Sequence, residues 1–466
     1  MATSRLSAAE APGGAATAPP DRRLRGVSRR RASAQLAARA TAGLFLAACG
    51  AVRPAADRGP ADLPGTFELL SQNWAPLNAI HDQAIAGFRE KNPRANVTQT
   101  PVPYGEIPTK VSASLAAGAG PDGYFHYTGF WRGVNARTVM LPLTPQLYKR
   151  NELERIFYPN LLDSVPAKDR EIYFLPAFVG MGGAGLLYNT DLLRAANIDP
   201  KSFTTLDTIL AAAAKLVRRE GGTISVAGLL HAHTSSIIFR WTMDQGGRFY
   251  DERNAKWNFQ TREMEQAMQW LVDLYDKHGV TWRRPPDGVR DALGEARAAM
   301  SMTGPFSLSG YRKNFPDVKL EDQPLPGFVP GRQPTYFEPE LAGYSLSALL
   351  TPNDPKTTLG IAFLRHLLSP DNALLLANEY SGCILIKGLY EDPRFKQTTF
   401  ADVRARMPEQ WINRIVLIPA AGANSYDFQQ HINKVVAGEL SISAALAEAQ
   451  QAFNVKEEEA RRNRGV

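Results

Sequence analysis

The sequence predicts an α/β protein built on an open sheet with helices packed against it. Three segments rich in β-branched and aromatic residues alternate with two amphipathic ones. Strands are expected at Phe67–Leu70, Val97–Val102 and Gly123–His126, and helices at Ala79–Lys91 and Ile107–Ala117. This alternation is typical of β-α-β units with right-handed crossovers, and it sets the fold class.

The predicted helices have clear local signals. The first ends at Asn92-Pro93, where the proline disfavours helical backbone in the residue before it. The second ends at Gly118, a residue suited to a helix C-terminus. The apolar face of the first helix comprises Ile80, Ala84, Ile85 and Phe88.

The same periodicity predicts further helices along the chain. They are expected from Leu206 to Val217 after a cap at Thr204 or Thr205, at Thr261–Lys277, at 357–368, at 370–380 and at about 441–454. The charged segment Glu457–Arg464 is expected to be a solvated or frayed tail.

Charge and cysteine content limit the function classes. The chain has 466 residues with 53 Lys+Arg and 46 Asp+Glu, a net charge of +7. Residues 1–48 contain eight arginines and two acidic residues, so the rest is nearly neutral and gives no argument for nucleic-acid binding. The remaining chain of about 400 residues is long enough for two lobes.

The N-terminal segment has the composition of a bacterial export signal. An arginine-rich stretch precedes the short apolar run Ala40–Ala48, and Leu46-Ala47-Ala48-Cys49-Gly50 resembles a lipoprotein lipobox. The resemblance implies that residues 1–48 are removed and that Cys49 is lipidated. Residues 49–64 would then form a tether, and Cys383 would have no cysteine to pair with. Ser28-Arg29-Arg30 resembles a twin-arginine signal, and this route and the general secretory route both stay open. No later apolar run approaches the roughly 20 residues of a membrane-spanning helix.

A series of short motifs follows in one order over about 65–455. They are Phe88–Pro93 with Val97, Ala116–Asp122, Met140–Leu143, Tyr173–Pro176 with Leu187–Leu193, Glu295–Met300 with Gly304–Phe306, Gly343–Ser347, and Gly438–Ser441 with Ala444–Leu446. In this order they resemble the extracellular solute-binding proteins of ABC importers, in the group that binds sugars and glycerol phosphate and is similar to maltose-binding protein. Two departures are the missing glycine before Met140 and Phe306 in place of a tryptophan.

The resemblance implies a two-lobe periplasmic-binding-protein fold of type II, with an open sheet in each lobe and a multi-segment hinge. The lobes are expected at 65–174 with 341–392 and at 175–340 with 393–455, followed by a charged tail at 456–466. The implied function is capture of a carbohydrate for an ABC permease by lobe closure, without catalysis or cofactor. The protein is expected to be an exported, lipid-anchored monomer.

The ligand site implied by the resemblance combines aromatic rings, which stack on sugars, with polar side chains. The expected ligand-binding residues are Trp74, Asp122, Tyr127, Trp131, Trp241, Phe306, Tyr344 and Tyr426. Each aromatic residue among them is alternatively an ordinary core residue. Trp257, Trp270 and Trp411 are expected in the core.

Other residues and motifs bear on alternative functions of the protein. Arg132 and Arg240 favour glycerol 3-phosphate or another anion if they face the ligand. An exported carbohydrate-active enzyme is a further alternative, although the sequence lacks H-E-x-x-H and G-x-S-x-G motifs. His231 and His233 form the one close histidine pair. The glycine-rich run Gly180–Gly185 suits a hinge or a close approach of the backbone to the ligand equally well.

Overall fold

The computed structural model describes residues 63–131, 135–165, 170–179, 184–232, 234–332, 334–337, 341–379, 383–398, 401, 415–416 and 425–464. The predicted leader, Cys49 and nearly all of the predicted tether lie outside these ranges. So do Arg132, His233, Trp411 and residues 180–183 of the glycine-rich run.

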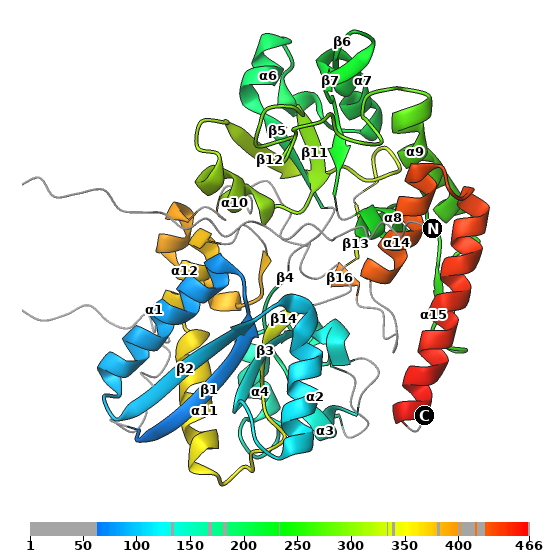
Figure 1. Cartoon of the computed structure of the whole chain (residues 1–466). Coiled ribbons are helices and arrows are strands. Elements are labelled where there is room, and N and C mark those ends of the chain that lie inside the picture. Colours follow the sequence, from blue (N-terminus) through cyan, green and yellow to red (C-terminus); the bar gives the residue numbers. More distant parts are fainter. Residues whose placement is uncertain are drawn as a thin grey trace, which may run out of the picture. The chain divides into compact units, whose positions relative to one another are not determined.

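The first sheet has six strands and is parallel on one side and antiparallel on the other (Figure 1). Its strands are β1 (Gly65–Gln72), β2 (Ala95–Val102), β3 (Gly123–Tyr127), β4 (Leu175–Val179), β14 (Ala342–Leu346) and β15 (Cys383–Ile384), in the order β15-β4-β14-β3-β1-β2. The three predicted strands, β1 to β3, are parallel neighbours. β14 returns from far along the chain and pairs antiparallel with both β3 and β4.

Helices pack around this sheet. They are α1 (Ala75–Lys91), α2 (Ile107–Ala117), α3 (Ala136–Val139), α4 (Arg150–Ile156), α5 (Pro159–Leu162), α11 (Pro355–Leu367) and α12 (Pro370–Glu379), with 3-10 turns η1 (Tyr104–Glu106), η2 (Thr128–Trp131), η4 (Lys387–Leu389) and η5 (Pro393–Gln397). α1 begins four residues before the predicted start, because Pro76 fits the first turn of a helix. Its predicted apolar face is buried, and α1 contacts α11 and α12.

The second sheet has four strands, with one parallel pair. They are β5 (Gly185–Asn189), β8 (Leu230–His231), β11 (Met300–Thr303) and β12 (Leu320–Pro324), in the order β12-β5-β11-β8. β11 runs parallel to β8 and antiparallel to β5. Smaller pairs are β6 (Arg218–Glu220) with β7 (Thr223–Val226), β9 (Tyr250–Asp251) with β10 (Lys256–Trp257), and β13 (Tyr336–Phe337) with β16 (Ile415–Val416).

The elements around the second sheet include two predicted helices with threonine caps. They are α6 (Thr190–Ala195), η3 (Pro200–Ser202), α7 (Leu206–Leu216), α8 (Thr234–Asp244), α9 (Arg262–Asp276), α10 (Ser307–Asn314), α14 (Ser425–Ala437) and α15 (Ile442–Arg464). The side chains of Thr205 and Thr261 accept hydrogen bonds from backbone N–H groups three residues on, which confirms the capping of α7 at Thr205. Among the described residues, no helix is both long enough and apolar enough to cross a membrane.

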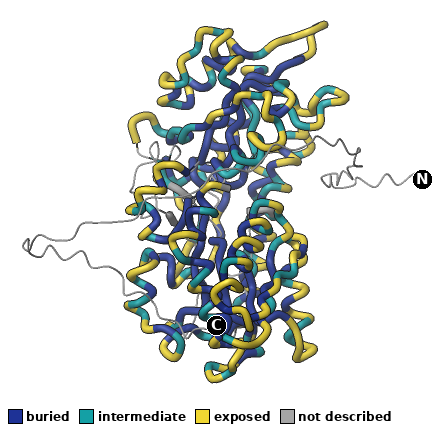
Figure 2. Tube along the Cα trace, turned by 90° about the vertical axis from the view of Figure 1, so that its left-hand side faces the viewer, coloured by how far each residue is buried: buried dark blue, intermediate teal, exposed yellow. Residues whose placement is uncertain are grey.

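Two large apolar cores divide the chain. One core takes its buried residues from 67–184 and 341–395, and the other from 186–325 and 428–453. Figure 2 shows the buried residues as dark blue stretches of the chain trace. The lobe boundary expected between 174 and 175 falls instead after β4, because all five β4 residues are buried in the first sheet. Phe395, expected in the second lobe, also lies in the first core.

The C-terminal segment differs from the prediction of a frayed tail. α15 continues to Arg464, and its buried stripe extends from Phe453 to Glu457 and Ala460 at helical spacing. The Tyr250 hydroxyl donates a hydrogen bond to a Glu457 carboxylate oxygen at 3.2 Å. This contact allows a charged residue that looked solvated in the sequence to lie inside the fold.

Candidate functional site

The carboxyl ends of the three parallel strands meet at one edge of the first sheet. Gln72 at the end of β1 lies opposite Val102 at the end of β2, and Tyr127 ends β3. The Tyr127 hydroxyl donates a hydrogen bond to Gln72 Oε1 at 2.6 Å. Trp74 lies two residues after β1 and is half-buried at the N-cap of α1. This is the edge at which open α/β sheets bind ligands.

Three aromatic rings cluster at this edge. The Tyr104 ring centroid lies 5.0 Å from that of Tyr127 and 4.8 Å from that of Phe130, and the last two centroids are 5.7 Å apart. All three rings are half-buried and tilted against one another, so each keeps some surface exposed. Tyr104 and Phe130 were not among the predicted site residues. Their position just after β2 and β3 is the signal that would have found them.

Phe306 brings an aromatic side chain from the second sheet to the first core. It follows β11 at the N-cap of α10, yet its half-buried ring packs against the core cluster of the first sheet. Trp74 and Tyr127 are also half-buried and lie against that cluster. The structure therefore places three of the predicted ligand-binding residues on the surface of one core, with contributions from both sheets.

Three other predicted ligand-binding aromatics belong to the interior instead. Trp131 is 2% exposed, and its indole N–H donates to His126 Nδ1 at 2.8 Å. Trp241 is fully buried in α8, where its ring packs against Trp270 and Phe328. Tyr344 is 3% exposed, and its hydroxyl is hydrogen-bonded to His81 Nε2 at 2.9 Å. Their surfaces are already occupied by protein, so the prediction that they contact ligand is not supported by their burial.

Asp122 lies at the opposite end of β3 from Tyr127. One carboxylate oxygen accepts from the Glu68 backbone N–H at 2.9 Å, and the other pairs with Lys356 Nζ at 3.0 Å. The carboxylate thus joins β3 to β1 and α11, at the opposite end of β3 from Tyr127 and its aromatic neighbours. Tyr426 falls in the first turn of α14, and its side chain is outside the described residues, as is Cys49.

A buried network of hydrogen bonds joins His126, near the C-terminal end of β3, to Trp131, Ser345 and Tyr173. The indole of Trp131 can only donate, so His126 Nδ1 accepts, and His126 Nε2 carries the proton toward Ser345 Oγ at 2.8 Å. Ser345 in turn donates to the Tyr173 carbonyl at 2.6 Å. Burial lowers the pKa of His126 to about 4 and outweighs the Tyr127 carbonyl 3.3 Å from Nδ1, so the imidazole is neutral, as the Trp131 donor needs.

Arg240 and His231, on which alternative functions depend, are hydrogen-bonded within the protein. Arg240 is 2% exposed and donates to the backbone carbonyls of Leu325 and Pro326. It is therefore unsuited to an anionic ligand. His231 bonds to Thr234 Oγ1 and to the Tyr275 hydroxyl. Across the part of the chain that the structure describes, no group of three or more His, Cys, Asp or Glu side chains is arranged to hold a metal ion.

Comparison with known proteins identifies related sequences. A family model described as bacterial extracellular solute-binding protein matches residues 74–374. An arabinooligosaccharide-binding protein of Halalkalibacterium halodurans is 25% identical over 291 residues, which cover 58% of this chain and 61% of that relative. The chain thus matches about three fifths of that relative's length.

Solved structures share the fold. The maltose/maltodextrin-binding domain MalE from Bdellovibrio bacteriovorus, bound to maltotriose, is 19% identical with a TM-score of 0.66, covering 84% of this chain and 98% of its own. The GacH receptor of Streptomyces glaucescens, solved unliganded and with acarbose, is 20% identical with a TM-score of 0.68, covering 85% and 99%. These similarities confirm the predicted two-lobe, type II periplasmic-binding-protein fold.

Proposed function

The chain belongs to the bacterial extracellular solute-binding proteins, and from that premise we propose that it captures a carbohydrate between two lobes and delivers it to the permease of an ABC importer. The first lobe is built on the six-stranded sheet and the second on the four-stranded sheet. Function then requires binding and closure rather than a chemical reaction, because a ligand that binds the closed form better shifts the population toward it.

The observation that carries this proposal is the set of half-buried aromatic rings supplied by both sheets. Trp74 and Tyr127 come from the first sheet and Phe306 from the turn after β11. Aromatic faces stack on the apolar C–H faces of sugar rings, and planar polar groups such as the Gln72 amide bond their hydroxyls. The relative named for arabino-oligosaccharides and the neighbour bound to maltotriose support a carbohydrate as the ligand.

The positions of the proposed hinge segments follow from the order of the strands along the chain. The chain leaves the first sheet after β4, enters the second at β5, and returns between β12 and β14. The first crossing contains the glycine-rich run, which suits a segment whose backbone angles change during closure.

A thermal-shift screen tests the ligand class. We expect mono- or oligosaccharides to raise the melting temperature of the protein, since a ligand at 100 times its Kd adds about 2.7 kcal/mol to the free energy of unfolding. The panel includes sugars, polyols and sugar phosphates. Stabilisation by glycerol 3-phosphate alone would replace carbohydrate with an anion, and cleavage of a glycosidic bond without stabilisation would favour an enzyme.

Substitutions separate ligand contacts from core residues. Tyr127→Ala and Phe306→Ala are expected to weaken sugar binding about tenfold or more at little cost in stability, because both rings are half-buried at the proposed site. Trp241→Ala should instead lower the free energy of unfolding by about 3–5 kcal/mol and leave the affinity of the folded protein unchanged. Calorimetric titration and urea unfolding measure the two effects. Unchanged affinity in both site variants would remove these rings from the site.

We also propose that the protein is exported and anchored by lipid at Cys49, which keeps the binding domain beside its permease. The support is the lipobox-like Leu46–Gly50 and the extracellular location of the family. Cys49→Ser is expected to abolish incorporation of labelled fatty acid and to release the protein from the membrane fraction. Cys383→Ser is the matched control and should leave labelling intact, because that thiol is buried. Equal labelling of Cys49→Ser and unaltered protein would contradict the anchor.

A further inference from the structure

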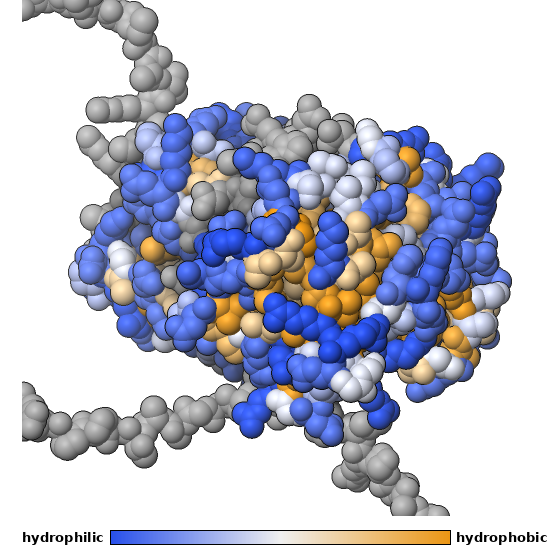
Figure 3. Space-filling model, turned by 90° about the horizontal axis from the view of Figure 1, so that it is seen from above, coloured by the Kyte–Doolittle hydropathy of each residue, from blue (hydrophilic) through white to orange (hydrophobic). Residues whose placement is uncertain are grey.

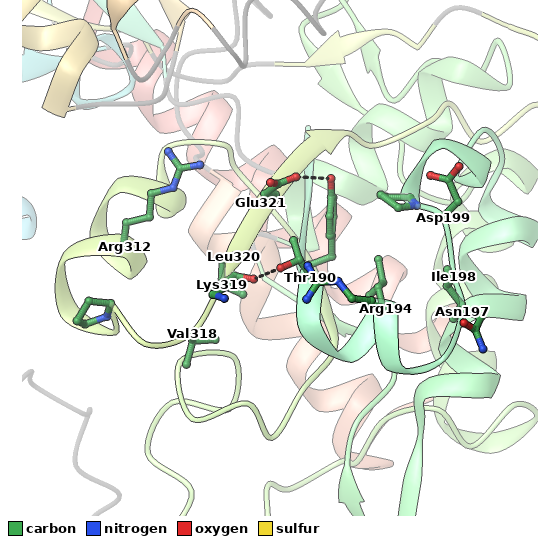
Figure 4. A pocket seen from close by; sticks show the side chains of 14 residues that line it. Thr190, Arg194, Asn197, Ile198, Asp199, Arg312, Val318, Lys319, Leu320 and Glu321 are labelled. Carbon is green, nitrogen blue, oxygen red and sulfur yellow. Dashed lines mark hydrogen bonds between the residues drawn. The ribbon is translucent and has the colours of Figure 1, made fainter.

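A second concave site lies at the far end of the second sheet. Thr303 of β11 pairs with Gly185 of β5, so Phe306 follows that end of the strand pair. Tyr188 and Thr190 mark the other end, where they line a pocket of about 980 Å³. α6, the segment before η3, α10 and residues 316–321 form its walls (Figure 4). This volume is within the range of sites that bind small molecules.

Side chains of both charge signs line the pocket. Arg194, Arg312 and Lys319 bring positive charge, and Asp199 and Glu321 bring negative charge. Figure 4 shows Arg312 on α10 and Arg194 on α6 on opposite sides, with Glu321 between them. Arg194 forms an ion pair with Asp191 at 2.8 Å. Among the described residues, neither Arg312 nor Lys319 forms an ion pair with a carboxylate.

The carboxylates of the pocket keep acceptor capacity. Glu321 accepts one hydrogen bond, from the Tyr188 hydroxyl at 3.3 Å, and Asp199 accepts one from the Lys201 backbone N–H at 2.9 Å. An ionised carboxylate has about four lone-pair positions, so each retains free acceptor sites. The pocket therefore presents guanidinium and ammonium donors next to carboxylate acceptors.

This arrangement selects the chemical class of a ligand. An anion would meet Glu321 and Asp199, and a cation would meet Arg312 and Lys319, each with unfavourable charge interactions. A hydroxyl group both donates and accepts, so adjacent hydroxyls can bond a carboxylate and a guanidinium at the same time. A neutral molecule with several hydroxyls satisfies both signs without repulsion.

The pocket also has apolar surface for the carbon skeleton of such a molecule. Ile198, Pro200, Pro316 and Val318 line it and stay partly or fully exposed. Figure 3 shows the same end of the molecule from above, where hydrophobic and hydrophilic residues lie side by side on the surface. The C–H faces of a sugar ring or polyol fit against such side chains.

We infer that this pocket is a second binding site for a polyhydroxylated ligand of the carbohydrate or polyol class. It is separate from the aromatic edge, the edge of the first sheet where Tyr104, Tyr127 and Phe130 cluster. It holds its ligand more weakly than the site between the lobes, with a Kd in the millimolar range, because its polar groups are exposed to water. Such a site would let one end of a long saccharide, or a second molecule, associate with the outer end of the lobe.

Calorimetric titration of the full-length protein with maltotriose and with arabinotriose tests the inference. We expect a weak second binding event that is retained in Tyr127→Ala and Phe306→Ala. The double variant R312A/E321Q should weaken it about tenfold, while the control Lys313→Ala, at an exposed neighbour that does not line the pocket, should leave it unchanged.

The outcomes separate the two sites. A single binding event that is lost in Tyr127→Ala and unchanged in R312A/E321Q overturns the second site and leaves the proposed function standing. Weak binding that depends on Arg312 and Glu321 but not on Tyr127 supports the second site, even if no event at the aromatic edge is found. Binding of acetate or tetramethylammonium with no binding of either trisaccharide overturns the inference, because the pocket would then select charge.

Discussion

Replacing Asp244 by alanine is expected to lower the free energy of unfolding by about 3–5 kcal/mol. The side chain is fully buried at the end of α8. One carboxylate oxygen accepts from the Phe328 backbone N–H at 3.0 Å and the other from the Thr335 backbone N–H at 2.6 Å. Arg240 Nε lies 4.0 Å from Asp244 Oδ2. Alanine would leave two backbone donors without this acceptor and the buried guanidinium without its counter-charge.

The contacts of Asp244 also fix the chain between the two lobes. Its carbonyl accepts from the Arg332 guanidinium at 2.8 Å, and Arg240 holds the Leu325 and Pro326 carbonyls. Residues 325–328, together with Arg332 and Thr335 before β13, are therefore attached to α8.

Urea unfolding compares Asp244→Ala with two other variants. Asp244→Asn keeps one acceptor oxygen and is expected to fall between the wild type and Asp244→Ala. Asp251→Ala removes an exposed carboxylate whose hydrogen bonds are confined to its own turn, so it should lower the free energy of unfolding far less than Asp244→Ala does. Equal costs for Asp244→Ala and Asp251→Ala would contradict the role given to Asp244.

Acid is expected to destabilise the protein between pH 6.5 and 4 through its buried histidines. His81 and His126 are fully buried, and burial lowers the pKa of each to about 4. The unfolded chain binds protons at about pH 6.5, so it holds more protons than the folded chain in this range. Stability is therefore fully present above pH 6.5 and is lost as the pH falls toward 4. By pH 5 the loss is about 2 kcal/mol for each histidine.

Burial is the largest effect on the pKa of His81, and it outweighs the hydrogen bond to Gln99 and the charge of Asp82, which both favour the protonated form. The Gln99 amide donates to Asp82 Oδ1 and to the Asn78 carbonyl, which leaves its oxygen to accept from His81 Nδ1 at 3.2 Å. His81 Nε2 then accepts from the Tyr344 hydroxyl. At His126 a second ring proton would face the Trp131 indole, which can only donate, whereas the Tyr344 hydroxyl at His81 can also accept.

Chemical denaturation at pH 7 and pH 5 measures this effect. His126→Gln, which does not titrate, should reduce the loss of stability between the two pH values by about 2 kcal/mol. His278→Gln, at an exposed position, should leave the pH dependence as it is in the unaltered protein. A pH dependence that is the same in all three proteins would contradict the assignment to buried histidine.

The sequence predicted the elements whose signals are local. The apolar stripe of α1, the threonine cap of α7 and the stop of α2 at Gly118 all appear as expected, because neighbouring residues determine them. The extension of α15 could not be predicted from its own charges. Glu457 is accommodated by Tyr250, a residue more than 200 positions away in the chain.

The candidate site shows the same division. Position after a strand predicted that Trp74 and Tyr127 lie near the carboxyl ends of β1 and β3, and the structure has them there. The same reasoning failed for Trp131, a few residues further on, because the turn of η2 directs its indole to His126 and into the core. Exposure depends on what packs against a ring, and sequence position does not reveal that.

The sequence by itself determined the α/β class, the family and the aromatic supply for a carbohydrate, since periodicity, caps and ordered motifs are written in local residues. Only the tertiary structure decided which aromatic rings keep exposed surface and which are buried in a core. It placed Phe306 against the first core, buried Trp241 and Tyr344, and assembled the pocket of Arg312 and Glu321. The physical reason is that burial and charge pairing are set by contacts between segments distant in the chain, which no single segment specifies.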